Sequence, residues 1–118
     1  MTSSEQATTH SELKRKVFVV NNSGYPYEKL EQYGEIIFLT QGSINHNRLN
    51  ASIKKMGNLL ATSSEQDYLC ISGNNFLCAL ATAIWGNMHG MCTFLNWNPI
   101  KKDYEKYNIM LRNGPQTE

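Results

Sequence analysis

Val17-Phe18-Val19-Val20 is a run of β-branched and aromatic residues that no polar residue interrupts. A strand with one wet face alternates apolar and polar residues, so a continuous apolar run predicts a strand that is buried on both faces. Ile36-Ile37-Phe38-Leu39 and Tyr68-Leu69-Cys70-Ile71 repeat this pattern further along the chain. Three such runs predict a parallel sheet that helices cover on both sides.

Helical patterns fill the intervals between these strands. Residues 26–33 predict a short helix, because Pro26 suits a first turn and Gly34 suits the position after the last turn. Residues 47–62 predict a second helix, whose apolar side carries Leu49, Ile53, Met56 and Leu60. Four polar residues lie largely on its other sides, namely Arg48, Lys54, Lys55 and Asn58.

Residues 75–89 predict a third helix, which Asn74 or Asn75 caps and Gly90 ends. This helix is apolar nearly all round, and a helix without a polar side is expected to be buried on more than one side. A fourth strand at residues 91–97 and an antiparallel fifth strand at residues 104–111 complete the pattern.

The resulting order of elements is β-α-β-α-β-α-β-β, which implies right-handed crossovers. We therefore expect the α/β class: a small, three-layer Rossmann-like fold whose parallel sheet has the flavodoxin-like order 2-1-3-4, with an antiparallel fifth strand at the edge. Residues 14–112 are expected to form this single domain. Residues 1–13 are expected to be a disordered tail and residues 113–118 a frayed C-terminus.

Composition and charge argue against several classes of protein. The chain has 118 residues, of which 41% are hydrophobic. Its longest apolar run extends only from Phe76 to Trp85, whereas a membrane-spanning helix needs about 20 apolar residues. The first residues are polar and do not resemble a secretory signal. We therefore expect a cytoplasmic protein without membrane contact. The net charge of +1 argues against nucleic-acid binding.

The three cysteines predict no metal site and no disulfide framework. Cys70, Cys78 and Cys92 lack the CxxC spacing of zinc sites, and each lies in an apolar run. We expect all three to be buried thiols that behave as small hydrophobic residues. No motif in the chain predicts a cofactor, because GxGxxG and GxxxxGK[ST] are both absent.

Small neutral polar residues lie at the carboxyl ends of the first four predicted strands, the fourth of which ends in Asn96-Trp97-Asn98. Ligands of open parallel sheets bind at the carboxyl ends of the strands, near the point where the strand order reverses. The candidate ligand-binding residues at these ends are Asn21, Ser23, Gly42, Ser43, His46, Ser72, Gly73 and Asn74. The alternative is structural, since Asn, Ser and Gly are also the common residues of turns and helix caps.

These loops offer little for catalysis. They contain no Asp and no Cys, and His46 is their only residue that titrates near neutral pH. His46 is a candidate for phosphate contact or for a general base, although a surface or capping role is the simpler interpretation. No catalytic residue is assigned, and we favour binding over catalysis.

Aromatic residues cluster near the first short helix and the end of the fourth strand: Tyr25, Tyr27, Tyr33 and Trp97. We interpret them as packing at the rim of the core or at a subunit interface. Stacking of a base on Tyr25 or Trp97 is the alternative.

Three segments resemble small Rossmann-like proteins encoded by tailed bacteriophages: Lys16 to Asn21, Gly34 to Gly42 and Asp67 to Gly73. The resemblance extends over residues 16–111. It implies action inside a bacterial host, and it supplies no catalytic residues.

Two functional hypotheses follow. The first is a non-catalytic binding module, a homodimer that holds a small anionic or nucleotide-like ligand at the carboxyl ends of the strands. We expect it to dimerise because the predicted helix at residues 75–89, which includes Ile84 and Trp85, has more apolar surface than one chain can cover. The second is a phage-encoded protein-interaction module that inhibits or redirects a host protein. An enzyme that uses His46 is a weaker third reading.

Overall fold

The computed structural model describes residues 15–43 and 45–111, which form one five-stranded sheet. The strands are β1 (Lys16–Asn22), β2 (Glu35–Gln41), β3 (Tyr68–Ile71), β4 (Met91–Asn98) and β5 (Asp103–Met110). Their spatial order is β2-β1-β3-β4-β5, with parallel pairs from β2 to β4 and an antiparallel β4–β5 pair. The predicted α/β class is confirmed, and the observed order contains the predicted 2-1-3-4 arrangement. The predicted tails, 1–13 and 113–118, lie outside the described residues.

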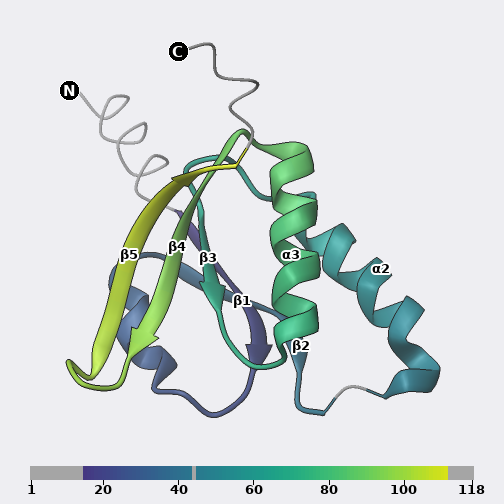
Figure 1. Cartoon of the computed structure of the whole chain (residues 1–118), viewed down its shortest axis with the longest axis horizontal. Helices are drawn as coiled ribbons and strands as arrows, with labels where there is room; N and C mark the ends of the chain where they lie inside the picture. The colour runs from purple at the N-terminus through teal and green to yellow at the C-terminus, as the bar shows by residue number, and fades with distance from the viewer. Residues whose placement is uncertain (1–14, 44, 112–118) are drawn as a thin grey trace, which may run out of the picture.

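Helices cover the sheet unequally (Figure 1). The two α-helices, α2 (Leu49–Leu60) and α3 (Asn75–Met88), lie together on one face. Two short 3-10 helices complete the set: η1 (Tyr27–Gln32) covers the opposite face, and η2 (His46–Arg48) leads into α2. The third layer of the fold is therefore a single short helix.

The first helical segment differs in type from the prediction. Residues 26–33 contain a 3-10 helix and not an α-helix, and Pro26 is its N-cap. Its closing bonds span three residues, with Tyr33 N donating to Leu30 O at 2.8 Å. A 3-10 helix is the tighter and shorter form, which suits the brief connection from β1 to the neighbouring β2.

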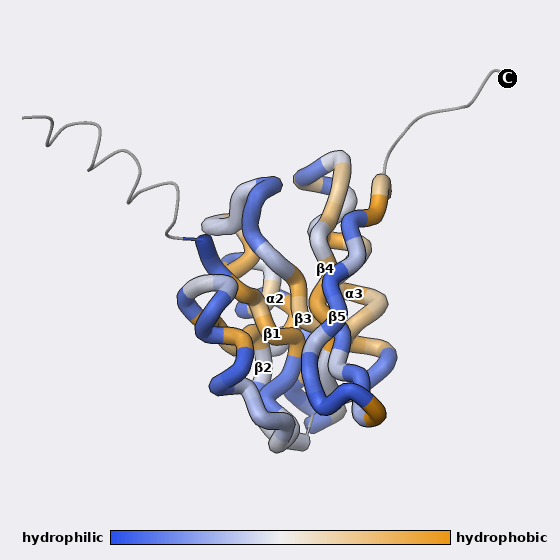
Figure 2. The backbone as a smooth tube through the Cα atoms, turned by 90° about the vertical axis from the view of Figure 1, so that its left-hand side faces the viewer, coloured by the Kyte–Doolittle hydropathy of each residue, from blue (hydrophilic) through white to orange (hydrophobic). Residues whose placement is uncertain are grey.

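The central strand β1 is buried on both faces, as its sequence predicts. Val17, Phe18, Val19 and Val20 are all 0% exposed. Phe18 and Val20 belong to the core beneath α2 and α3, whereas Val17 and Val19 belong to the core beneath η1. Figure 2 shows β1 and β3 coloured mainly hydrophobic in the interior, with the hydrophilic β5 at the edge.

Asp67 joins the amino ends of the central strands. Its side chain is only 4% exposed. Lys16 N donates to Asp67 Oδ1 at 2.9 Å, and Ser64 N donates to Oδ2 at 2.7 Å. Both carboxylate oxygens therefore accept backbone hydrogen bonds, which fixes the start of β1 against the turn before β3.

The outer side of α3 is exposed within this chain, contrary to the expected burial on more than one side. Leu77, Cys78, Ala81 and Trp85 are buried, but Phe76 is 53% exposed. Trp85 is 0% exposed and its Nε1 donates to Met91 O at 2.9 Å. This side chain is therefore part of the core and not of a free surface. Among the described residues, no helix has the length and apolarity needed to cross a membrane.

The three cysteines are buried free thiols, as predicted. Burial raises the pKa of Cys70 to about 12, with a further contribution from Cys78, and burial raises the pKa of Cys92 to about 12. Burial also raises the pKa of Cys78. Within residues 15–43 and 45–111, no group of three His, Cys, Asp or Glu side chains could hold a metal ion.

The thiols should react slowly with a thiol reagent in the native protein. At pH 8, a thiol with a pKa of about 12 is ionised on the order of 10³ times less than a free cysteine. Labelling followed by mass spectrometry should show Cys78, which is 8% exposed, reacting before the other two, which are 0% exposed. In denaturant all three should react at one fast rate. Native labelling of Cys70 or Cys92 at that rate would contradict their burial.

Candidate functional site

The carboxyl ends of β1 and β3 are bridged by hydroxyl groups. Tyr27 Oη, which comes from η1, lies 2.8 Å from Ser72 Oγ and donates to Asn21 O at 3.0 Å. Ser23 Oγ lies 3.0 Å from Ser72 Oγ, and Ser23 N donates to Tyr27 Oη at 2.8 Å. The space between the two strands at the point where the strand order reverses is thus filled by side chains of the protein itself.

Asn21 links this hydroxyl cluster to the end of β2. The residue is 4% exposed, and its Nδ2 donates to Gly42 O at 3.0 Å. Its Oδ1 is buried and has no hydrogen-bond partner among the described residues. The predicted residues Asn21 and Gly42 therefore meet, although they do so through a structural hydrogen bond.

Gly73 closes the cluster from the β3 side. Its φ of +84° is in the left-handed region, which favours glycine. A Cβ at this position would lie 2.7 Å from Asn21 Cβ and 3.3 Å from Ser23 Oγ. The space beside the candidate ligand-binding residue Gly73 is therefore occupied by Asn21 and Ser23 of the same chain. A bulky side chain at Gly73 would disturb the packing of β1 against β3, so the substitution would report on folding and not on ligand access.

The other predicted site residues have separate places. Asn74 caps α3, with Leu77 N donating to Asn74 Oδ1 at 3.1 Å. His46 lies in η2, but its side chain is outside what the structure describes. Ser43 lines a pocket at the end of β2. The structure thus brings Asn21, Ser23, Ser72 and Gly73 together in a closed group, and it separates Ser43 and Asn74 from them.

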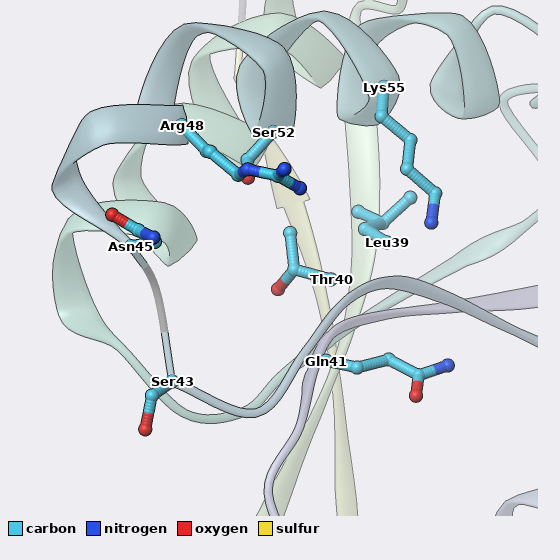
Figure 3. Close-up of a pocket in the computed structure, with 8 residues that line it drawn as sticks. All are labelled: Leu39, Thr40, Gln41, Ser43, Asn45, Arg48, Ser52 and Lys55. Carbon is cyan, nitrogen blue, oxygen red and sulfur yellow. The ribbon is translucent and has the colours of Figure 1, made fainter.

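The pocket beside Ser43 has a volume of about 470 Å³. Its floor comes from β2, with Leu39, Thr40 and Gln41. Its remaining walls come from the following loop, with Ser43 and Asn45, from the last residue of η2, Arg48, and from α2, with Ser52 and Lys55. In Figure 3 the Arg48 side chain extends from the start of α2 over Thr40, and the Lys55 side chain extends toward Leu39.

The pocket is cationic. Arg48 and Lys55 form no ion pair within residues 15–43 and 45–111, where Lys101 and Glu105 make the recorded ion pair. None of the lining residues is acidic. The adjoining first turn of α2 has neither an acidic residue nor a side-chain cap, so nothing described offsets the positive end of the helix dipole. The arrangement favours an anion over a cation.

Sequence reasoning missed most residues of this pocket. The helical pattern places Arg48 and Lys55 on the polar sides of a helix and predicts no ligand-binding role for them. The available signal was the spacing of Arg48, Ser52 and Lys55, which are four and three residues apart and share one side of a helix. Periodicity shows that these side chains share a side, but only the tertiary structure shows that this side meets the end of β2.

The chain matches a family of known proteins. A family model described as "Phage Pam3 gp32-like protein" matches residues 14–111. No curated protein and no solved structure is significantly similar to the chain.

Replacing Gly73 should report how tightly the hydroxyl cluster is packed. Gly24 is a matched control, because its φ of +93° is similar but nothing lies within 4 Å of its Cβ position. In urea denaturation, Gly24→Ala should lower the free energy of unfolding by about 1–2 kcal/mol for the left-handed backbone alone. Gly73→Ala should cost about 1–3 kcal/mol more, because the new methyl group overpacks against Asn21. If both variants lost the same free energy of unfolding, the space between the carboxyl ends of β1 and β3 would be open.

Proposed function

The chain belongs to the family of Phage Pam3 gp32-like proteins, and from that premise we propose that it serves a phage inside the host cytoplasm as a non-catalytic binding module. The proposed ligand is a small anionic molecule that bears phosphate or a similar group. It binds in the pocket at the carboxyl end of β2, between Arg48 and Lys55. The observation that carries this proposal is the pair of cations without ion-pair partners in a pocket whose lining contains no acid.

The position of the pocket supports an anionic ligand. It lies at the carboxyl end of a parallel strand, which is where open α/β sheets bind their ligands. The start of α2 lies at the same end and has neither an acidic residue nor a side-chain cap, and the helix dipole favours negative charge there. Arg48 adds a planar guanidinium, which can donate two parallel hydrogen bonds to a phosphate.

The chemistry of the lining supports binding more than turnover. Its described side chains are hydroxyls, amides, one leucine and two cations. A nucleophile needs a positioned base, and none of these groups is a base at neutral pH. The Tyr27, Ser23 and Ser72 cluster is likewise made of neutral hydroxyls that bond to each other and to backbone.

Inorganic phosphate is a direct probe of this pocket. In a low-salt NMR titration, phosphate should shift amide signals of residues 43–55. Arg48→Ala and Lys55→Ala should each weaken binding about three- to tenfold, the range expected for one charge-assisted hydrogen bond at an exposed site. Because the contacts are solvent-accessible, raising the salt concentration should weaken binding further.

Lys54→Ala is the matched control. Lys54 lies in the same helix and carries the same charge, but it does not line the pocket. This variant should bind phosphate as the unmodified protein does. An equal loss of binding in all three variants would indicate only a general electrostatic attraction, and unshifted signals throughout residues 43–55 would contradict the proposal.

A homodimer is the proposed assembly, and its interface is the α3 face. We define the α3 face as the outer side of α3 with the adjoining, mostly apolar hollow, which is lined by Ile71, Phe94, Asn96, Tyr107 and Ile109. The two parts lie on the same side of the sheet, because Ile71 and Phe94 pack against the core beneath α3. α3 contains no charged residue. Depletion of charge and enrichment of aromatic residues are typical of interface centres.

The size of the α3 face suits a second copy of the chain. Phe76 is 53% exposed and Tyr107 is 45% exposed. An aromatic side chain buries about 150–250 Å² when it is fully covered, so these two would contribute on the order of 200 Å² to an interface. That is roughly a quarter of the ~800 Å² that each partner buries in a standard interface. A protruding helix beside a hollow also permits the self-complementary contact that a two-fold axis requires.

The second candidate function is a protein-interaction module that binds a host protein. The same observation favours it, because an uncharged face with an exposed aromatic residue suits another protein as well as a second copy. The two candidates differ in the mass of the isolated protein. A homodimer covers the α3 face without a partner, whereas an interaction module leaves the face exposed until the host protein binds.

Sedimentation at micromolar concentration should give about twice the monomer mass of 13.4 kDa. Phe76→Asp should shift the protein to the monomer, because it places a charge in the proposed interface. Asp in the first turn of α3 is compatible with folding, since it opposes the helix dipole favourably. Ile100→Asp is the control, because Ile100 is 90% exposed in the turn between β4 and β5 and outside the α3 face. A monomer in the unmodified protein would refute the homodimer and favour the interaction module.

A further inference from the structure

The two cations of the pocket are separated along the helix. Arg48 and Lys55 are seven residues apart, at the start of α2 and about two turns into it. At 1.5 Å per residue, their backbones are about 10 Å apart along the helix axis. Figure 3 shows the two side chains over different residues of β2, Arg48 over Thr40 and Lys55 near Leu39. The pocket therefore has two positive ends and not one positive centre.

The space between the cations is neutral and polar. Ser52 lines it from α2, four residues after Arg48 and three before Lys55. Asn45 lines the pocket on the other side of Arg48, where its Oδ1 accepts from Asn47 N at 2.8 Å (Figure 3). Thr40 Oγ1 donates its proton to Val20 O at 2.7 Å and can only accept from a ligand. This middle section suits a polar, uncharged group that both donates and accepts hydrogen bonds.

The volume also exceeds what a single small anion needs. At about 470 Å³, the pocket falls within the ~300–1,000 Å³ of sites that bind small organic molecules. One phosphate bound to Arg48 would leave Lys55 without an anion, and the reverse arrangement would leave Arg48 without one. A ligand with an anionic group at each end would neutralise both cations.

Resting on the proposed function, we infer that the ligand of this pocket is a bisphosphate: two phosphate groups joined by a neutral, hydroxyl-bearing spacer. One phosphate binds Arg48 at the start of α2, where the helix dipole adds to the attraction. The other binds Lys55. The spacer lies along Ser52 and above Thr40.

The test compares ligands that differ in the number and spacing of phosphates. Fructose 1,6-bisphosphate has two separated phosphates, fructose 6-phosphate has one, and pyrophosphate has two adjacent ones. In NMR titrations at constant ionic strength, fructose 1,6-bisphosphate should bind at least about tenfold more tightly than either of the others. In Arg48→Ala and in Lys55→Ala, its affinity should fall to that of fructose 6-phosphate, whereas Lys54→Ala should keep the full preference.

The outcomes separate this inference from the proposed function. If the bisphosphate binds no more tightly than fructose 6-phosphate, or if pyrophosphate binds as tightly as the bisphosphate, the two-ended ligand is refuted and the anion pocket stands. If no probe shifts the signals of residues 43–55 in the unmodified protein, the anion pocket and the bisphosphate both fail. Thermal melts of the three variants establish that each is folded.

Discussion

The burial of β1 on both faces is the constraint on which the rest of the structure depends. Four consecutive residues, Val17 to Val20, are completely buried, so each face of the sheet must be covered at its centre. α2 and α3 cover one face with a large core. The other face is covered by the short connection from β1 to β2, which must therefore supply Tyr27 and Leu30 to the smaller core.

This requirement also shapes the chemistry at the carboxyl ends of the strands. Tyr27 packs in the smaller core beneath β1. From this position its hydroxyl group contacts Ser72 and the loop after β1. The usual ligand position of an open α/β sheet is thereby filled by the chain itself. The solvent-accessible space lies one strand further out, at the end of the edge strand β2, where α2 brings cations instead of hydroxyls.

Much of the fold follows from the sequence, because continuous apolar runs and helical stripes are local signals that burial enforces. The types of the strands and the positions of α2 and α3 appear in the pattern, and Asn74 is one of the two residues that the pattern offers as the cap of α3. The candidate functional site could be predicted from the sequence only in part. Asn21, Ser23, Ser72 and Gly73 do converge, but the pattern could not show that the Tyr27 hydroxyl closes them, since an aromatic side chain near a turn reads as packing. The roles of Arg48 and Lys55 depend on where α2 meets β2, which no local spacing encodes.

The position of β1 at the beginning of the folded region has a consequence for biosynthesis. Val17 pairs with Tyr68 of β3, and Lys16 N bonds to Asp67 across 51 residues of sequence. At about 5–20 residues per second, the ribosome needs roughly 3–10 s to deliver β3 after β1 has been made. During that interval the strand with the longest run of buried residues lacks at least one of its two neighbours. The nascent chain therefore exposes an unpaired strand edge at Val17 to Val20 until translation has passed residue 71.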